Sequence, residues 1–241
     1  MRHKWVGFLA VAVISCGIVC GSVRAETPKW VEEGFTPIFD GKTLDGWDGD
    51  PDLWDVHDGV IYGKTKEGQL TRNQFIIWRG AEPENFVLKL QFKMNGGNSG
   101  VQVRSQENEK EWGHWVMGGY QVDMDADDNY TGGVYEERGG RGVMPYRGKN
   151  CFCDADGKFH SDDVFADDAN LKKVVKKNDW NDLEIIVEGF DIVVKINGVQ
   201  TGHFTDNTVA QRKVKGLIGF QLHVGPPMEV WFRNIQIQEK K

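Results

Sequence analysis

The stretch Gly216-Leu-Ile-Gly-Phe-Gln-Leu-His-Val-Gly-Pro-Pro-Met-Glu-Val-Trp-Phe-Arg-Asn-Ile-Gln-Ile237 contains two strand-like runs on either side of a Gly-Pro-Pro turn. In the first run, the apolar Phe220 and Leu222 alternate with Gln221 and His223. Successive side chains of a strand point to opposite faces of its sheet. The run therefore predicts a strand with one core face and one polar face, and the polar face meets either water or a binding site.

The same alternation recurs along the chain, in short runs separated by loops that hold many of its 30 glycines. Residues 85–93 put four apolar side chains on one face and mainly lysine and glutamine on the other. Residues 183–187 and 192–196 form two more strands, and Asn197-Gly198 favours a tight hairpin turn after them. Short alternating runs between turns predict an all-β sandwich of two antiparallel sheets.

Neither a repeat nor a low-complexity linker interrupts the chain, so residues 26–241 are predicted to form a single domain with a sizeable core. One short helix is expected near Asp167 to Lys177, where an aspartate can cap its start and lysines gather toward its end. Cys151 and Cys153 are expected to be two loop thiols or a local bridge.

The N-terminus is predicted to be a secretory signal peptide that covers residues 1–25. Arg2 and Lys4 precede a mostly apolar stretch that is too short to span a membrane comfortably, and a small-residue cleavage site ends at Ala25. An alternative stays open, because the residues before Cys16 resemble a bacterial lipobox that would place a lipid on this cysteine. The protein is therefore expected to be exported, to the periplasm or the cell exterior.

The charge balance of the chain is acidic. Removal of residues 1–25 takes away three basic residues and no acidic one, which changes the formal net charge from −7 to −10. An acidic chain is repelled by phosphate backbones and by anionic lipid surfaces, so nucleic acid and membranes are not expected as partners.

Two further strands repeat the pattern of one apolar and one polar face. In residues 98–104, Gln102 and Arg104 alternate with two valines. In residues 119–125, the polar side chains lie on the face opposite Tyr120, Val122 and Met124. The polar face of this second strand consists of Gln121, Asp123 and Asp125.

A third strand, residues 131–138, has a parity that the sequence leaves open. It offers the polar face either Tyr135 with Glu137 or Val134 with Glu136. Trp112, in an expected loop between two of these strands, has an aromatic ring that could stack on a sugar. A single tryptophan is also a common packing residue, so this interpretation of Trp112 has an alternative.

If these strands are neighbours in one sheet, they predict a single face rich in Gln, Asp, Glu, Arg and His. Such a set of hydrogen-bonding groups suits sugar hydroxyls and differs from the Lys, Glu and Thr of an ordinary solvated face. A solvated outer face is the alternative interpretation, because antiparallel sheets commonly have one.

Seven motifs of the sequence, in this order, resemble one family, the 3-keto-disaccharide hydrolases, also described as 3-keto-glucoside-1,2-lyase/hydratase domains. The resemblance covers nearly all of residues 26–241, and no single motif is decisive. The motifs are Phe35 to Trp47, Gly97 to Val101, Gly119-Tyr120, Thr131 to Tyr135, Trp180-Asn181, Ile196 to Val199 and Gly216 to Ile237.

The resemblance implies a concanavalin A-like jelly roll with a cleft for an oxidised carbohydrate. It places Arg104, His223 and the strand from Tyr120 to Asp125 on that cleft. This sequence has Gln121 and Asp123 where the commoner family pattern after the tyrosine is Glu-x-Gln, and it lacks the usual Gln-Asp-His near the end. It therefore resembles a distinct subgroup of the family.

The reaction that the resemblance implies is the cleavage of a 3-keto-glycoside. A base removes the proton on C2, the group on C1 leaves, and water can add afterwards. His223 or Asp123 is the expected base, Arg104 the expected stabiliser of the enolate oxygen, and Glu136 or Glu137 the donor to the leaving oxygen. The expected substrate-binding residues are Gln102, Trp112, Gln121, Asp125, Tyr135, Glu137 and Gln221.

The residues predict no particular cofactor, and Asp123, Asp125 and His223 have two interpretations, as ligands of a divalent metal ion or as hydrogen-bonding groups only. Two other functions stay open. A conventional glycoside hydrolase would use paired carboxylates, but the strand from Gln121 to Ala126 lacks the Glu-x-Asp-x-x-Glu of jelly-roll glucanases. A non-catalytic carbohydrate-binding module would share the fold, because fold does not determine function.

Overall fold

A computed structural model describes Met1 and residues 29–240 of the chain. The predicted signal peptide, with the alternative lipid site at Cys16, lies outside the described residues. Within residues 29–240, no helix is both long and apolar enough to cross a membrane.

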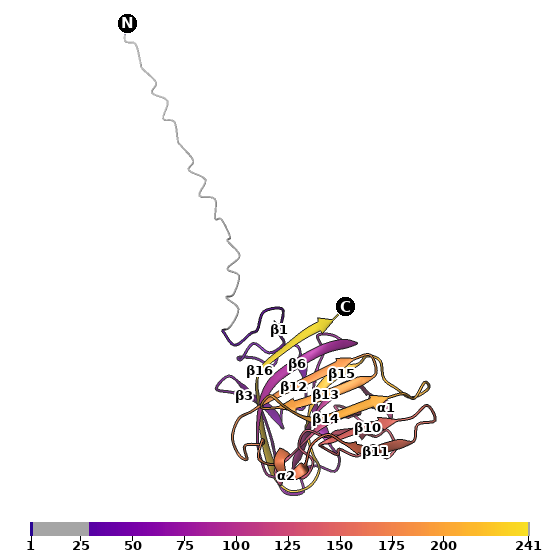
Figure 1. The fold of residues 1–241 in the computed structure, drawn as a ribbon. Coiled ribbons are helices and arrows are strands. Elements are labelled where there is room, and N and C mark those ends of the chain that lie inside the picture. Colours follow the sequence, from indigo (N-terminus) through magenta and orange to yellow (C-terminus); the bar gives the residue numbers. More distant parts are fainter. Residues whose placement is uncertain (2–28, 241) are drawn as a thin grey trace.

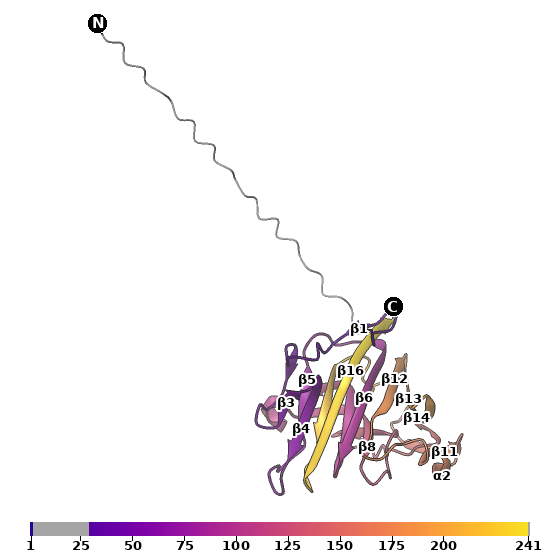
Figure 2. The ribbon, with the colours of Figure 1, turned by 90° about the vertical axis from the view of Figure 1, so that its left-hand side faces the viewer.

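The larger of two sheets has ten strands, and Figures 1 and 2 show it as a continuous curved layer. All its pairs are antiparallel except β10 with β14, which run parallel. Its strands, in spatial order, are β11 (Phe159–Val164), β10 (Lys149–Cys153), β14 (Val199–Asp206), β13 (Asp191–Ile196), β12 (Asn181–Glu188), β6 (Asn85–Asn95), β16 (Met228–Lys240), β4 (Val60–Thr65) and β3 (Trp54–His57), and β1 (Thr36–Pro37) pairs with β16.

The smaller sheet has six antiparallel strands. One of its inner strands, β15, is the polar-faced run of the stretch Gly216 to Ile237; β7 pairs with β15, and β8 pairs with β7, so the strands with the shared alternation are neighbours in one sheet. In spatial order, its strands are β2 (Trp47–Asp48), β5 (Gln74–Trp78), β15 (Leu217–Leu222), β7 (Asn98–Glu107), β8 (Met117–Asp125) and β9 (Val134–Glu137).

The two sheets pack face to face through the apolar side of each strand. Phe220 of the smaller sheet stacks on Phe232 of the larger one with 4.0 Å between ring centroids, and Trp47 also stacks on Phe220, at 4.8 Å. Because the inner faces use the apolar residues, the alternate residues of each strand point outward. The polar face predicted from the sequence is thus the outer face of the smaller sheet.

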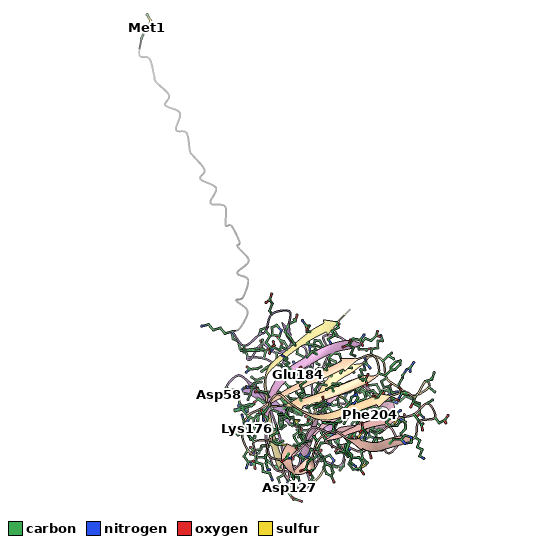
Figure 3. The ribbon with its side chains drawn as sticks, in the orientation of Figure 1. Met1, Asp58, Asp127, Lys176, Glu184 and Phe204 are labelled. Carbon is green, nitrogen blue, oxygen red and sulfur yellow. The ribbon has the colours of Figure 1, made fainter. Side chains whose placement is uncertain are left out.

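The predicted hairpin turns and the predicted helix are present in the structure, although the helix is shorter than expected. Asp58 and Gly59, and likewise Asn197 and Gly198, have the paired positive φ angles of a tight hairpin turn, and Figure 3 labels Asp58. The expected helix is one turn, α2 (Asp168–Leu171), and a second short helix, α1 (Glu109–Trp112), was not predicted.

The two cysteines of the described part are free thiols. Cys151 and Cys153 alternate with the exposed Phe152 on β10, so both point into the core. Burial raises the pKa of each thiol to about 11. They are two thiols, as one of the two interpretations of the sequence had it, but their predicted place in a loop is wrong, because both lie on a strand of the core.

Candidate functional site

A cleft of about 350 Å³ opens on the outer face of the smaller sheet, at the end where β15 and β8 finish and β5 and β7 begin. Five of the predicted site residues line it together, namely Gln121, Asp123, Tyr135, Glu137 and His223. The complete lining is Asn73, Asn98, Gln121, Asp123, Tyr130, Tyr135, Glu137, Met144, Pro145 and His223.

Asp123 is the most strongly perturbed group of the cleft. Its residue is only 6 % exposed, and its Oδ1 accepts a hydrogen bond of 2.7 Å from Gln121 Nε2. Loss of water, with a smaller contribution from the carboxylates of Glu137 and Asp125, raises the pKa of Asp123 to about 7, against the opposing effect of the Gln121 hydrogen bond. A carboxyl with a pKa near neutrality can both accept and give a proton at physiological pH.

Glu137 lies beside this carboxyl on the neighbouring strand β9. Burial is the largest influence on it and raises its pKa, whereas the positive charge of Arg138 and the hydrogen bonds from Asn73 and Gln221 act in the opposite direction. Asn73 Nδ2 donates to both carboxylate oxygens at 3.3 and 3.4 Å, and Gln221 Nε2 donates at 3.4 Å. The cleft therefore holds two partly desolvated carboxyls on adjacent strands.

His223 follows the last residue of β15 and has a fixed ring orientation. Its Nδ1 lies 2.5 Å from the carbonyl oxygen of Val224, which can only accept, so Nδ1 carries the proton. In the neutral imidazole, Nε2 then keeps its lone pair. Asn73 Oδ1 accepts the backbone N–H of Val224, and this bond joins the turn of His223 to the strand that supplies Asn73.

A hydrogen-bonded row of buried amide side chains lies beneath the carboxyls of the cleft. Ser105 Oγ donates to Gln102 Oε1, Gln102 Nε2 donates to Gln121 Oε1 at 2.8 Å, and Gln121 Nε2 continues the row to Asp123. Gln121 lies flat across β7 only because position 100 is glycine, since a Cβ atom there would collide with the Gln121 side chain. The row fixes the orientation of each amide, so the Asp123 carboxylate receives an N–H group.

Three side chains form the rim of the cleft, and two of them are aromatic. Tyr130 and Met144 are exposed, and Tyr135 is partly buried on β9, where the nearby carboxylates of Glu137 and Asp123 act on its hydroxyl. Arg147 holds the two rim segments together, because its guanidinium binds the buried Asp128 at 2.6 Å and also the Asp128 carbonyl oxygen. Exposed aromatic rings on fixed segments suit the apolar face of a sugar ring.

The burial of Asp123 has a consequence for stability. The folded protein retains the proton of this carboxyl up to a pH of about 7, whereas an unperturbed aspartate loses it near 3.8. Between these pH values the folded state binds more protons, so this contribution to the free energy of unfolding decreases as pH rises. We expect Asp123→Asn to raise stability relative to the wild type at pH 8 by more than at pH 4, by a few kcal/mol. Urea unfolding at both pH values measures the difference in free energy of unfolding between the variant and the wild type. An equal difference at the two pH values would contradict the prediction.

The predicted position of Arg104 on the polar face is wrong. A register shift between Val103 and Gln106 interrupts the pairing of β7 with β8, and Arg104 has a φ angle of 45° within it. The bulge turns its side chain away from the cleft. The guanidinium instead donates to the backbone carbonyl oxygens of Glu84 and Gly189, at 2.6 to 2.9 Å.

The sequence left open which residues of β9 face the cleft, and in the structure they are Tyr135 and Glu137. Glu136 points to the inner side, so its predicted position in the site is wrong. Its carboxylate binds the guanidinium of Arg141 at 2.6 Å, and the same guanidinium binds Asp206 of the larger sheet at 2.8 Å. Glu136 therefore belongs to a buried ion network that joins the two sheets.

Asp125 and Trp112 also lie outside the cleft lining. The Asp125 carboxylate accepts the backbone N–H groups of Asp127 and Asn129, which close the turn after β8. Trp112 stacks near the guanidinium of Arg138, with 5.4 Å from the ring centroid to Cζ. No group of three His, Cys, Asp or Glu side chains among residues 29–240 is arranged to hold a metal ion, so the suggested ligands do not converge.

The remaining predicted residues gather on the outer face as expected. Gln102, Gln121 and Gln221 are buried in the amide row, and Asp123, Tyr135, Glu137 and His223 line the cleft above it. Several other lining residues were not predicted, because they lie in loops or at strand ends, where the sequence has no repeating pattern. These are Asn73, Asn98, Tyr130, Met144 and Pro145.

Comparison with solved structures places the sandwich among concanavalin A-like jelly rolls. A candidate glycosyl hydrolase of Parabacteroides distasonis is 23% identical, with a TM-score of 0.57 and coverage of 86% of this chain and 99% of that one. A laminarinase of a Flavobacterium species is 10% identical, with a TM-score of 0.54 and coverage of 85% and 98%. A carbohydrate-binding module of Bacillus subtilis is 15% identical, with a TM-score of 0.51 and coverage of 80% and 96%.

Sequence comparison identifies the family. A search of curated proteins finds no match. The sequence profile of the 3-keto-alpha-glucoside-1,2-lyase-like domain matches residues 34–238, which include every strand from β1 to β15 and most of β16. This match and the cleft both support a carbohydrate-active role. The chain belongs to the 3-keto-alpha-glucoside-1,2-lyase-like domain family.

Proposed function

We propose that this domain cleaves 3-keto-glycosides by elimination. The ketone at C3 acidifies the proton on C2, so a base of moderate strength can remove it. The electron pair of the C2–H bond forms an enolate, the C1–O bond then breaks, and C1 and C2 become joined by a double bond. The leaving oxygen takes a proton, and water can add to the enone afterwards.

The observation that carries this proposal is the pKa of Asp123, which burial raises to about 7. A base works best when its pKa lies near the operating pH, because it is then both ionised and strong enough to accept the proton. Asp123 is the base in this mechanism. The Gln121 amide keeps its carboxylate oriented toward the cleft.

His223 supplies the proton to the leaving oxygen. The bond from Nδ1 to the Val224 carbonyl oxygen leaves Nε2 available to the cleft, and in the imidazolium form Nε2 carries the proton that is transferred. The amide of Asn98, which also lines the cleft, donates to the enolate oxygen in the place first expected for Arg104. The rings of Tyr130 and Tyr135 contact the sugar face.

The test compares two substrates with the same chromogenic leaving group, a 3-keto-glucoside and the unoxidised glucoside. We expect release only from the keto substrate, together with loss of deuterium from C2 when that position is labelled. Release from the unoxidised glucoside would indicate a conventional hydrolase that uses Asp123 and Glu137 as paired carboxylates. Binding without release from either substrate would indicate a binding module. A parallel assay with chelator tests the divalent metal that the sequence suggested.

A further inference from the structure

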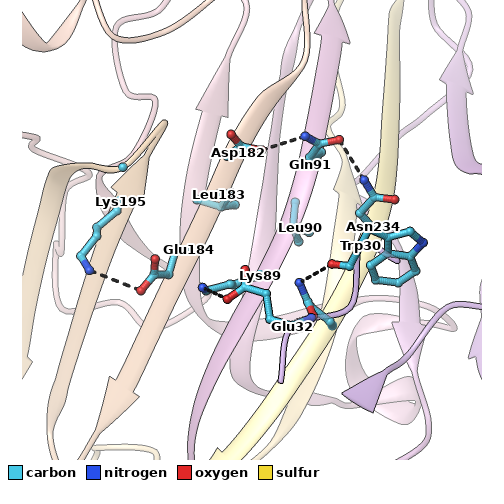
Figure 4. Close-up of a pocket in the computed structure, with 12 residues that line it drawn as sticks. Trp30, Glu32, Lys89, Leu90, Gln91, Asp182, Leu183, Glu184, Lys195 and Asn234 are labelled. Atoms are coloured by element: carbon cyan, nitrogen blue, oxygen red, sulfur yellow. Dashed lines mark hydrogen bonds and ion pairs between the residues drawn. The ribbon is translucent and has the colours of Figure 1, made fainter. Parts of the chain in front are cut away.

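A second hollow, of about 360 Å³, lies on the outer face of the larger sheet, the side of the sandwich away from the cleft. Figure 4 draws the side chains around it, which come from β6, β12, β13 and β16 and from the segment before β1. Its volume is similar to that of the cleft. The proposed reaction uses none of its residues.

The floor of this hollow contains a distortion in the middle of the sheet. The register of β16 against β6 shifts between Arg233 and Gln236, and Asn234 within the shift has a φ angle of 53°. A bulge in a strand redirects a side chain that regular pairing would place elsewhere. Here the amide of Asn234 lines the hollow, where its Nδ2 donates to Gln91 Oε1 at 3.1 Å and its Oδ1 has no partner among residues 29–240.

Trp30 forms one wall, and its backbone is fastened to β16. Gln236 Oε1 accepts the backbone N–H of Glu32 at 2.8 Å, and Gln236 Nε2 donates to the Trp30 carbonyl oxygen at 3.4 Å. The indole of Trp30 is half-buried, and no cation or aromatic ring of the described chain stacks on it. By contrast, Trp231 on the same sheet is covered by Lys93, whose Nζ lies 4.4 Å from its ring.

Two of the acidic groups around the hollow form ion pairs with lysines, and the third, Asp182, accepts a hydrogen bond from a neutral amide. Lys89 pairs with Glu32 at 2.6 Å, Lys195 pairs with Glu184 at 3.3 Å, and Gln91 donates to Asp182 at 2.7 Å. The lining has two basic and three acidic side chains, so it does not favour an anion. Each pair still has unused N–H groups or oxygen lone pairs, and vicinal hydroxyl groups can bond to both kinds.

We propose that this hollow is a second saccharide-binding site, one that binds a neutral sugar unit and performs no chemistry. The sugar stacks its apolar face on the free indole of Trp30, and its hydroxyl groups bond to Asn234 and to the charge pairs. A site on this face can hold a glycan chain while the cleft on the other face acts on a substrate. The inference stands on the residues of the larger sheet and does not depend on the proposed elimination.

The test uses the indole N–H signals of the purified protein in a nuclear magnetic resonance titration with cellotetraose, maltotetraose and laminaritetraose. We expect at least one of these neutral oligosaccharides to shift the Trp30 signal saturably. Trp30→Ala is expected to weaken the binding at least tenfold. Asn234→Gly, which suits the positive φ angle, is expected to weaken it severalfold. Turnover of the keto substrate should be unchanged in both variants.

Trp231→Ala is the matched control, because it also removes a tryptophan from the outer face of the larger sheet, at a position covered by Lys93. It is expected to bind as the wild type does, and so is the cleft variant Asp123→Asn. The proposal is overturned if none of the three oligosaccharides shifts the Trp30 signal, or if binding persists in Trp30→Ala. Loss of binding in Asp123→Asn with retention in Trp30→Ala would assign all saccharide binding to the cleft.

Discussion

Asp123→Asn is expected to lower turnover of a 3-keto-glycoside by about 10²–10⁴-fold, the usual contribution of a well-positioned general base. Asparagine has the same shape, and its Oδ1 can still accept the Gln121 N–H group, so the amide row below the cleft remains. The loss should therefore appear in kcat with little change in KM. The wild-type profile of kcat against pH should also have a limb near pH 7, which the variant lacks.

The control for this experiment is Asp125→Asn on the same strand. Both aspartates lie on one side of β8 by sequence parity, but the Asp125 carboxylate caps a turn and lies outside the cleft. Its replacement should leave turnover within a fewfold of the wild type. If Asp123→Asn keeps full turnover, Asp123 is not the base, and His223 becomes the next candidate.

The architecture was predictable because it depends on side-chain alternation, which is a local property of the sequence. The residues of β15, β7 and β8 alternate without interruption where they face the cleft, so the positions of Gln102, Asp123 and Gln221 followed directly. The hairpin turns were predictable for a similar reason, since Asn-Gly and Asp-Gly readily adopt positive φ angles.

Arg104 shows that side-chain alternation predicts the face of a residue only as far as the next β-bulge. One extra residue in a strand reverses the face of every side chain beyond it, and nothing in the run of valine, glutamine and arginine indicates the bulge. The sequence also could not decide whether Glu136 or Glu137 faces the cleft, because β9 has only four residues and begins in a glycine-rich turn. In such short strands, the register is set by the neighbouring strands and not by the strand itself.

Asn73 had no signal of any kind in the sequence. It precedes β5 and contacts Glu137 only because β9 and the end of β15 are brought to the same edge of the cleft. The side chain of Asn73 contacts partners that are 64 and 151 positions away in the sequence. The role of Asn73 therefore depends on the complete tertiary arrangement, whereas the role of Gln121 could be inferred from its own strand.

Arg141→Met is expected to have the largest effect on stability. The Arg141 side chain is 5% exposed and lies between the carboxylates of Glu136 and Asp206, which are 5% and 3% exposed. Methionine fills similar space but leaves two buried carboxylates without a cation. Removing one partner of a buried ion pair lowers the free energy of unfolding by about 3–5 kcal/mol. For a domain of this size, we expect a fall in Tm of roughly 6–20 °C, measured by thermal unfolding.

Three further variants separate this ion network from catalysis. Arg141→Met with Glu136→Gln should recover part of the lost stability, because the glutamine is neutral and one buried charge is gone. Lys240→Met, which breaks the exposed pair with Glu188, should change stability by less than about 1 kcal/mol. Glu136→Gln alone should retain turnover, since its carboxylate faces away from the cleft. A fold as stable as the wild type combined with a large loss of turnover in Glu136→Gln would instead return this residue to the active site.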